Sequence, residues 1–400
     1  MFGFGKSKKA TTDEGKIDEL LTRGVSEVIE KDSLKKRLLS GDVLRIKLGI
    51  DPTSPNLHLG RSVPLLKLRD FQELGHKIVF IVGDATGVIG DTSDKESERP
   101  MLTEEDVENN AKTYFEQAGK ILDLNEVEKK HNSEWLNNLS YSEIGEQANQ
   151  FSLAEFIARE NIKKRLDSGK RVSLREVLYP LMQGYDSVAV RADVEIGGTD
   201  QRFNLLSGRT MQNYYKQEPQ NILTTNLIEG IDGRKMSSSW GNTINLNDEP
   251  NDMYGKIMKI DDSLIEKYFI HTTRISSSEI KEHIEKGPRE AKSALSYEIV
   301  KMYWGEGAAD SAEKSFVNTF SEGGVPDDVR KVGAKKDNLL SEVFLKHEVV
   351  SSKNEFSRLI KSGAIKNMAN NEKIDDIKAV VGGGGIFKVG KKKFIEVSSL

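Results

Sequence analysis

Apolar residues early in the chain recur at two spacings, which together predict a strand–helix–strand unit. Residues 43–50 form a strand-like run, and residues 59–74 place leucines and a phenylalanine on one helical stripe that stops before Gly75. The run IVFIV at residues 78–82 is short and rich in β-branched residues, as is typical of a parallel strand covered on both faces. We therefore expect a βαβ unit with a right-handed crossover.

Further along the chain the same two spacings alternate. Residues 103–175 are mostly helical and polar. The run VEIGG at residues 194–198 predicts a strand between helices at 180–192 and 200–216. This alternation predicts an α/β fold, a Rossmann-like parallel sheet with a helical insertion. From residue 250 to 320 the pattern is helical without strands.

These changes of pattern divide the chain into segments. Residues 1–32 begin as a polar leader and continue into a helix whose apolar positions run from Ile17 to Ile29. The stretch EGGVPDDVRKVGAKKDN has the composition of a linker. The predicted order is a leader and helix at 1–32, a Rossmann-like domain at 33–233 with its insertion at about 103–175, a loop and all-helical domain at 234–321, a linker at 322–338, and a small α+β domain at 339–400.

Composition excludes several classes of function. The chain is 36% hydrophobic and 30% charged, and no apolar run approaches the roughly 20 residues of a membrane span. The polar N-terminus lacks an apolar signal core, so we expect a cytoplasmic protein with no membrane partner. Without cysteine there is no disulfide or thiolate zinc site, and the six histidines show no metal-ligand spacing. No protein-bound metal is therefore expected.

Charge is distributed unevenly. Residues 338–400 contain eleven Lys and Arg and seven Asp and Glu, so this segment has a net charge of +4. Because the whole chain has a net charge of −4, the remainder has a net charge of −8. A basic terminal module on an acidic body is typical of nucleic-acid binding, although a lysine-rich solvated surface gives the same balance.

A candidate nucleotide site follows the first predicted strand, in GIDPTSPNLHLG at residues 49–60. Neither a Walker loop nor a G-x-G-x-x-G turn occurs there. A helix that begins near His58 would aim its N–H groups and positive dipole end at an anion, with Thr53 and His58 as side-chain donors and Gly60 allowing close approach. The ordinary alternative is a histidine that caps the helix or lies on the surface.

Two later motifs supply further chemistry. GRKMSSS at residues 233–239 is a glycine-led, serine-rich loop with two cations, which suits a phosphate clamp but also an ordinary surface turn. In YPLMQGYD, Tyr179, Gln183 and Asp186 stand at helical spacing on one side of a helix, with Pro180 in its first turn. Such a face suits either a polar amino-acid pocket or a solvated surface.

The histidine–glycine element and the KMSSS loop together resemble the two signature motifs of class I aminoacyl-tRNA synthetases. Over nearly its whole length the chain resembles the bacterial tyrosyl-tRNA synthetase family. Matching stretches include KLGIDPTSPNLHLG, GDATGVIGDTSDKESER, NSEWL, YPLMQGYDSVAVRADVEIGGTDQRFNLL and GRKMSSS, and the tail resembles an S4-type RNA-binding domain.

The resemblance implies a reaction and its partners. The substrates would be L-tyrosine, ATP with Mg²⁺ and tRNA(Tyr). The enzyme would be a homodimer. The tyrosine carboxylate would attack the α-phosphorus of ATP, expel pyrophosphate, and leave tyrosyl-adenylate for transfer to the terminal ribose of the tRNA. Two rivals stay open, namely a tryptophanyl-tRNA synthetase, which shares the scaffold, and a non-catalytic RNA-binding paralogue.

The resemblance also implies roles for single residues. Catalytic contacts to the phosphates would come from Thr53, His58, Lys95, Arg99 and Lys235. The ATP-binding set would be Gly49, Asp51, His58, Gly60, Arg61, Gly198, Asp200, Lys235, Met236 and Ser238. Tyrosine would be bound by Thr86, Asp91, Tyr179, Gln183, Asp186 and Gln201, with Asp186 accepting the phenol proton. RNA would be bound by Lys353, Arg358, Lys361, Lys366, Lys391, Lys392 and Lys393.

Three positions depart from the pattern of the family. The first motif usually ends in histidine, where this chain has Arg61, and the second often carries a lysine where this chain has Ser238. Some members place a tyrosine that shares the substrate phenol where this chain has Lys47. The resemblance leaves the second partner of the phenol open.

Overall fold

The computed structural model describes residues 10–91, 101–320, 329–370, 372–390 and 393–399. The chain divides into two compact units, Met1–Gly305 and Glu306–Leu400. No helix of the described residues is long and apolar enough to cross a membrane.

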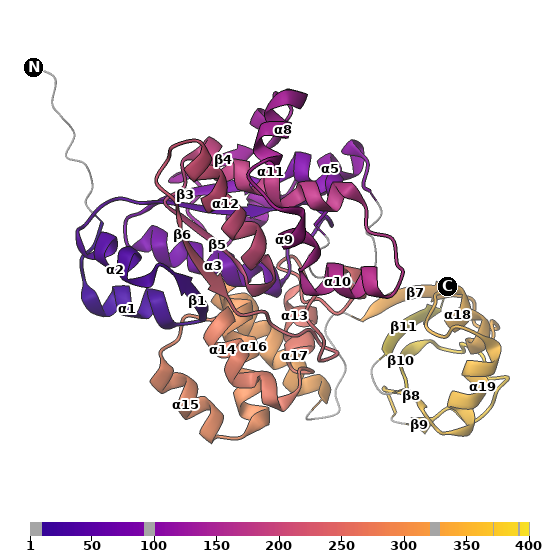
Figure 1. The fold of residues 1–400 in the computed structure, drawn as a ribbon. Coiled ribbons are helices and arrows are strands. Elements are labelled where there is room, and N and C mark those ends of the chain that lie inside the picture. The colour runs from indigo at the N-terminus through magenta and orange to yellow at the C-terminus, as the bar shows by residue number, and fades with distance from the viewer. Residues whose placement is uncertain (1–9, 92–100, 321–328, 371, 391–392, 400) are drawn as a thin grey trace, which may run out of the picture. The chain divides into compact units, whose positions relative to one another are not determined.

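A six-stranded sheet forms the centre of the first unit (Figure 1). Its strands lie in the order β1-β6-β5-β2-β3-β4, and all neighbours are parallel except β1, which runs antiparallel to β6. The strands are β1 (Val25–Ile29), β2 (Arg45–Ile50), β3 (Lys77–Val82), β4 (Val127–His131), β5 (Val194–Gly198) and β6 (Asn221–Thr225). The parallel sheet confirms the predicted α/β class.

Helices cover this sheet and position its functional edge. Ile78–Val82 of β3 are wholly buried, so this strand is covered on both faces as predicted. The helices are α1 (Glu14–Thr22), α2 (Lys31–Leu39), α3 (Leu59–Glu73), α4 (Asp84–Ile89), α5 (Glu104–Ala111), α6 (Tyr114–Ala118), α7 (Ser133–Leu136), α8 (Tyr141–Ala148), α9 (Leu153–Ile157), α10 (Glu160–Asp167), α11 (Leu174–Val190) and α12 (Arg202–Tyr214).

Helix α11 begins earlier than predicted, for a local reason. Ser173 and Glu176 form a capping box that starts the helix at Leu174. The Glu176 carboxylate also accepts two bonds from Arg165, and both side chains are almost fully buried. Pro180 therefore lies inside the helix rather than in its first turn, where it was predicted.

Two strands replace predicted helix. The expected helix through Ile29 ends at Thr22, and β1 follows it, pairing antiparallel with β6. The expected helical insertion at about 103–175 contains β4, which adds to the edge of the sheet beside β3. The first prediction was wrong over β1, whereas the insertion is mostly helical as predicted and only β4 was missed. Side-chain spacing does not report which backbone groups meet a neighbouring strand.

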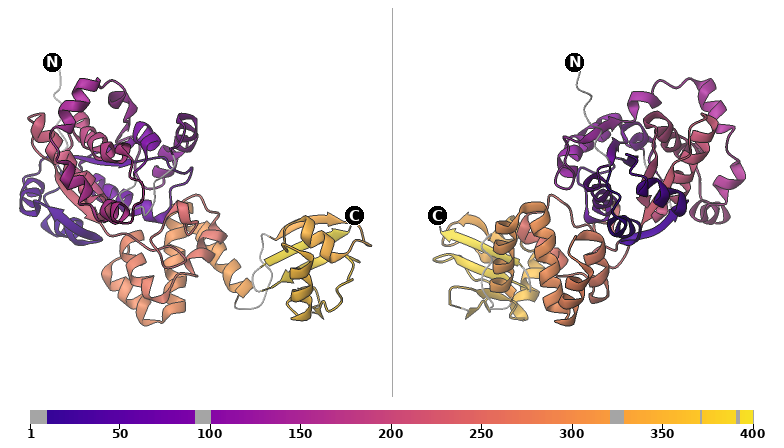
Figure 2. Two further views of the ribbon diagram at one scale, coloured as in Figure 1. Left: turned by 45° about the vertical axis from the view of Figure 1, so that its right-hand side comes forward. Right: turned by 90° about the vertical axis from the view of Figure 1, so that its left-hand side faces the viewer.

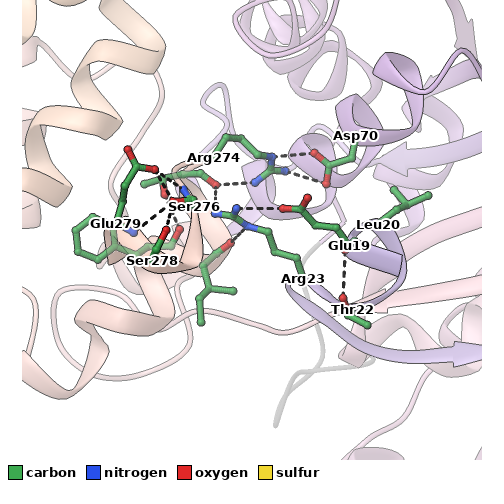
Figure 3. A network of polar contacts seen from close by, with 12 residues as sticks. Glu19, Leu20, Thr22, Arg23, Asp70, Arg274, Ser276, Ser278 and Glu279 are labelled. Atoms are coloured by element: carbon green, nitrogen blue, oxygen red, sulfur yellow. Dashed lines mark hydrogen bonds and ion pairs between the residues drawn. The ribbon is translucent and has the colours of Figure 1, made fainter. Parts of the chain in front are cut away.

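A helical segment follows the sheet, as predicted, with α13 (Pro250–Ile257), α14 (Ile265–Thr272), α15 (Ser277–Glu285) and α16 (Pro288–Trp304). It is tied to the sheet region by the polar network of Figure 3, in which Arg274 donates to both carboxylate oxygens of Asp70 on α3, at 2.8 and 3.3 Å. Arg23, just after α1, donates to the carbonyl of Thr273 at 3.1 Å. The helix that carries the histidine motif is thereby bound to the segment that follows the KMSSS loop.

The second unit contains α17 (Glu306–Phe320) and a small α+β domain, whose sheet and helices can be followed in Figure 2. Helices α18 (Leu340–Lys346) and α19 (Lys353–Lys361) share one core with the sheet, built around Phe344, Phe356 and Phe387. The strands lie in the order β7-β11-β10-β8-β9, with bounds Arg330–Ala334, Lys393–Ser399, Gly385–Val389, Ile365–Asn367 and Glu372–Lys373. The linker predicted at 322–338 is wrong over Arg330–Ala334, because β7 pairs in parallel with β11.

Candidate active site

A cavity of about 220 Å³ opens at the carboxyl ends of the parallel strands. Asp51 follows β2, Gly83 follows β3, and Gly198 ends β5, and all three line this cavity. In open parallel sheets this edge is where ligands bind. Gly83 is required here, because a Cβ at this position would lie 2.2 Å from Oδ1 of Asp51.

The two signature segments meet at this cavity. The hydroxyls of Ser54 and Ser238 lie 3.1 Å apart, and the Gly60 N–H donates to Sδ of Met236 at 3.2 Å. The backbone N–H of Leu59 bonds to the carbonyl of Ile244 at 2.8 Å, which holds the chain just beyond the loop against the start of α3. The structure thus brings together two motifs that are remote in sequence.

His58 occupies the N-cap position of α3 but makes no capping bond with its side chain, which removes the capping interpretation. Its Nδ1 has no hydrogen-bond partner among the described residues, and its ring lies against Gly60, where a Cβ would come within 3.0 Å of it. Burial, helped by the charges of Arg61 and Lys235, lowers the pKa of His58 to about 3. His58 is therefore a buried, neutral ring at the cavity wall at neutral pH.

Arg61 organises the loop between β2 and α3. Its guanidinium donates to Oγ1 of Thr53 at 2.7 Å and to the carbonyl of Asp51 at 3.0 Å. It also donates to the hydroxyl of Tyr114 at 2.8 Å, and Tyr114 donates in turn to the carbonyl of Ser54 at 2.6 Å. Because Thr53 accepts this bond, its own hydroxyl proton remains available to a ligand.

The KMSSS loop is held by Asn242, which is almost fully buried. Oδ1 of Asn242 accepts from the Ser237 N–H at 2.9 Å, and its Nδ2 donates to the Lys235 carbonyl at 3.0 Å. Lys235 directs its ammonium to Oδ2 of Asp200 at 2.8 Å. The predicted phosphate-binding lysine and an acid of the predicted ATP-binding set thus lie side by side.

Tyr179 and Asp51 are joined directly. The Tyr179 hydroxyl donates to Oδ2 of Asp51 at 2.8 Å, and the Thr86 hydroxyl donates to its Oδ1 at 2.7 Å. Burial raises the pKa of Asp51 to about 6, against these two hydrogen bonds, which lower it. Tyr179, Gln183 and Asp186, which their spacing placed on one side of a helix, all line the cavity.

Asp186 lies deeper and receives two further donors. Nε1 of Trp135 donates to its Oδ1 at 2.8 Å, and Nδ2 of Asn132 donates to its Oδ2 at 3.3 Å. Asn132 also donates to Thr86 at 2.9 Å, so a chain of hydrogen bonds connects Asp186 to Asp51. Burial raises the pKa of Asp186 to about 7, while the charge of Lys47 and the two donors lower it.

The remaining predicted residues fall into three groups. Gln201 and Asp91 line the cavity and are bonded to one another, Nε2 to Oδ2, at 2.7 Å. Gly49 also lines the cavity. Lys95, Arg99, Lys391 and Lys392 lie outside the described residues. Among the part of the chain that is described, no group of three or more His, Asp or Glu is placed to hold a metal ion.

The predicted RNA-binding residues lie in the second unit. Lys353, Arg358 and Lys361 are exposed on α19, and Lys393 donates to the carbonyl of Val349 at 2.6 Å. Lys366 on β8 stands in register with Lys373 on β9 and Lys388 on β10. These two lysines extend the predicted set, and only the strand pairing shows that they are neighbours.

Several functional neighbours were not predicted as such. Trp135 and Asn132 hold Asp186 from more than fifty residues away in the sequence, which no local pattern indicates. Asn242 holds the nearby KMSSS loop, but nothing in its local sequence indicates that its side chain turns back onto that loop. The signal for the first two was the stretch NSEWL, which matched the family without an assigned role.

Comparison with known proteins identifies the family. A family model described as tRNA synthetases class I (W and Y) matches residues 40–321, and the chain belongs to this family. It is 43% identical to the tyrosine–tRNA ligase of Thermotoga maritima, over 95% of this chain and 96% of that protein. It is also 43% identical to the tyrosine–tRNA ligase of Carboxydothermus hydrogenoformans, over 95% of this chain and 97% of that protein. These relatives place the chain with the tyrosine members of the family rather than the tryptophan members.

A solved structure agrees with this assignment. The C-terminally truncated mitochondrial tyrosyl-tRNA synthetase of Coccidioides posadasii matches with a TM-score of 0.62 and 26% identity, covering 75% of this chain and 91% of that chain.

Proposed function

We propose that the chain activates L-tyrosine with ATP and Mg²⁺, forming tyrosyl-adenylate and pyrophosphate, and then transfers tyrosine to the terminal ribose of tRNA(Tyr) in the cytoplasm. The observation that carries this proposal is the meeting of both signature segments at the cavity that Tyr179, Gln183 and Asp186 line. Because the tyrosine carboxylate is itself the nucleophile, the protein need only position the reactants and stabilise charge.

At the amino-acid end, Asp186 would accept the substrate's phenol proton. Two N–H donors already fix the orientation of the Asp186 carboxylate. Its oxygens have further lone pairs, so it can still accept a hydrogen bond from the substrate. Tyr179, Gln183, Asp91 and Thr86 would surround the ammonium, and Gln201 would lie on the carboxylate side. Gln201 donates to Asp91, and Thr86 and Tyr179 both donate to Asp51, which supports such a prearranged polar surface.

At the nucleotide end, Thr53 and His58 would donate to the departing phosphates, and the N-terminus of α3 would add its backbone N–H groups. Gly49, Asp51, Gly60, Gly198 and Asp200 would border the adenylate. Lys235 would exchange its bond with Asp200 for a phosphate oxygen when ATP and its Mg²⁺ enter. Lys95 and Arg99 belong to the same proposal on the resemblance alone.

The small α+β domain would bind tRNA. The three lysines in register across β8, β9 and β10 place like charges directly opposite one another, which costs stability unless an anion lies against them. The phosphates of an RNA backbone are anions of that kind. The exposed cations of α19 add to the same basic domain.

A homodimer is part of this proposal. Large apolar side chains are exposed on the helices of the insertion and on α11, among them Leu153, Ile157, Leu166 and Leu174. Exposed apolar side chains gathered in one region mark interaction surfaces. Sedimentation of the purified chain at micromolar concentration should give twice the chain mass, and Leu174→Glu should reduce that mass to one chain.

The direct test is ATP–pyrophosphate exchange with tyrosine, tryptophan and phenylalanine offered separately. Exchange with tyrosine alone, followed by charging of tRNA(Tyr), is the expected result. Exchange with tryptophan would replace the amino acid in the proposal, and no exchange with any of the three would favour the non-catalytic paralogue.

A further inference from the structure

We propose that Lys47 and Glu195, a buried ion pair behind the amino-acid end of the cavity, are positioning residues that determine how strongly Asp186 selects tyrosine over phenylalanine. The inference rests on the proposed role of Asp186 as the acceptor of the substrate phenol. Neither side chain lines the cavity, so both act through other residues.

The pair is built into the sheet. Lys47 on β2 and Glu195 on β5 are neighbours in parallel register, and their side chains are 0% and 1% exposed. The ammonium lies 2.9 Å from Oε1 of Glu195 and also donates to the Ser187 hydroxyl at 2.8 Å and to the Gln183 carbonyl at 2.9 Å. An ammonium has three donors, and these three acceptors use all of them. Lys47 therefore cannot donate to the substrate phenol itself.

Glu195 holds the same turn of α11 from the other side. Its Oε1 accepts from Nε2 of Gln183 at 3.2 Å, and its Oε2 accepts from the Ser187 hydroxyl at 3.0 Å. Gln220 adds a further bond to Oε2. The pair thus binds both the backbone and the side chain of Gln183, and it binds Ser187, the residue next to Asp186. The direction in which α11 presents Asp186 depends on these contacts.

The same ion pair also affects the ionisation of Asp186. The positive charge of Lys47 lowers the pKa of Asp186, and the negative charge of Glu195 raises it, with Lys47 having the larger effect. The other groups that face Asp186 are the uncharged donors Trp135 and Asn132 and the phenol of Tyr179. Among the described residues, Thr86 and Asn132 connect Asp51 to Asp186 by hydrogen bonds, and the Tyr179 phenol that faces Asp186 also donates to Asp51.

Stability alone does not account for this arrangement. A fully buried ion pair is weak evidence for stability, because its desolvation cost offsets much of its attraction. An ionised carboxylate, by contrast, accepts the phenol proton in a charge-assisted bond about twice as strong as a neutral one. Keeping Asp186 ionised near neutral pH is a function that a buried cation next to α11 can serve.

The experiment compares Lys47→Met, Glu195→Gln and the double variant with the wild type. For each, kcat/KM for tyrosine in ATP–pyrophosphate exchange is measured from pH 5.5 to 9, since this ratio reports the ionisation of the free enzyme. We expect the acid limb to move to higher pH in Lys47→Met and to lower pH in Glu195→Gln. The double variant should lie between Lys47→Met and the wild type. At pH 7 the preference for tyrosine over phenylalanine should fall about tenfold or more in Lys47→Met, with KM for ATP unchanged.

Lys67→Met serves as the matched control, because Lys67 is another buried lysine, 3.0 Å from Asp70 on α3 and away from the cavity. It should lower the melting temperature without moving the pH profile. Shifts of Lys47→Met and Glu195→Gln in the same direction, or losses of stability without a shift, would overturn the proposal. If Lys47→Met does not fold, the shift of Glu195→Gln to lower pH decides the matter. A wild type that exchanges no tyrosine refutes the proposed function instead.

Discussion

The two ends of the cavity differ in how far the protein has satisfied its own polar groups. At the proposed amino-acid end, Asp186 holds two hydrogen-bond donors from the protein, and Asp91 accepts a bond from Gln201. At the proposed nucleotide end, Nδ1 of His58 has no hydrogen-bond partner among the described residues, and the ammonium of Lys235 donates to Asp200. The first end is suited to selecting a substrate before any chemistry. The second is suited to groups that find their partners only as phosphate charge develops.

The largest expected effect comes from removing the acceptor at the prearranged end. Sites that hydrogen-bond a substrate hydroxyl reject the analogue without it by roughly 10⁴–10⁵, with tyrosyl-tRNA synthetases as the standing example. Asp186→Asn should therefore lower the ratio of kcat/KM for tyrosine over phenylalanine by roughly 10³ or more. KM for ATP serves as the control and should not change. An unchanged ratio would remove Asp186 from the selection of the phenol.

The next effect tests the nucleotide end. Removing one preorganised donor to a developing charge typically costs about 10²–10³ in kcat. Thr53→Ala and His58→Ala should each lower kcat of ATP–pyrophosphate exchange by about that factor, while the dissociation constant of tyrosine measured by calorimetry stays the same. If tyrosine binding weakens instead, the two ends are not separate in function.

A smaller effect concerns RNA and leaves both ends of the cavity intact. Reversing the exposed charges of α19, in Lys353→Glu with Arg358→Glu and Lys361→Glu, should raise KM for tRNA(Tyr) on the order of tenfold and flatten its salt dependence. ATP–pyrophosphate exchange should not change. Lys378→Glu, an exposed lysine of the same domain outside the predicted set, is the matched control. Equal effects of both variants would indicate a general charge effect rather than a binding face.

The smallest effect is on stability. The folded-state pKa of Asp186 is raised to about 7, above the roughly 4 of an unfolded chain, so its favourable contribution is complete below pH 4 and is lost as pH rises through 7. Asp186→Asn does not titrate, so its melting temperature should gain a few degrees on the wild type between pH 4 and pH 8 in tyrosine-free buffer. If the difference in melting temperature between Asp186→Asn and the wild type narrows with rising pH, the pKa of Asp186 is not raised in the folded state.

The sequence predicted the elements whose patterns are local. The strand, helix and strand of β2, α3 and β3 carry strong apolar periodicity. The helical spacing of Tyr179, Gln183 and Asp186 predicted a shared helix face, and only the structure shows that this face lines the cavity. Strand β1 was missed because its apolar residues continue the helical spacing of α1. Strand β4 was missed because it lies at the sheet edge and carries charged residues.

The contacts within the site were predictable only where a motif contained them. The roles of Arg61 and Lys47 could be assigned only from the structure, because the sequence does not show which hydrogen-bond acceptors a cationic side chain contacts. Arg61 bonds to Thr53 and Tyr114, and Lys47 bonds to Glu195 across neighbouring strands. In both cases the position that departed from the family pattern is filled by a residue that supports the site from within the protein.

The pairing of Lys47 with Glu195 has a practical consequence for protein engineering. Because the buried lysine is neutralised by Glu195 rather than by Asp186, exchanging Asp186 for a neutral residue does not leave a lone cation in the interior. Residue 186, which we propose contacts the substrate phenol, can therefore be varied in a library for tyrosine analogues while β2 and β5 stay unchanged. Libraries that randomise residue 47 together with residue 186 would place the scaffold itself at risk.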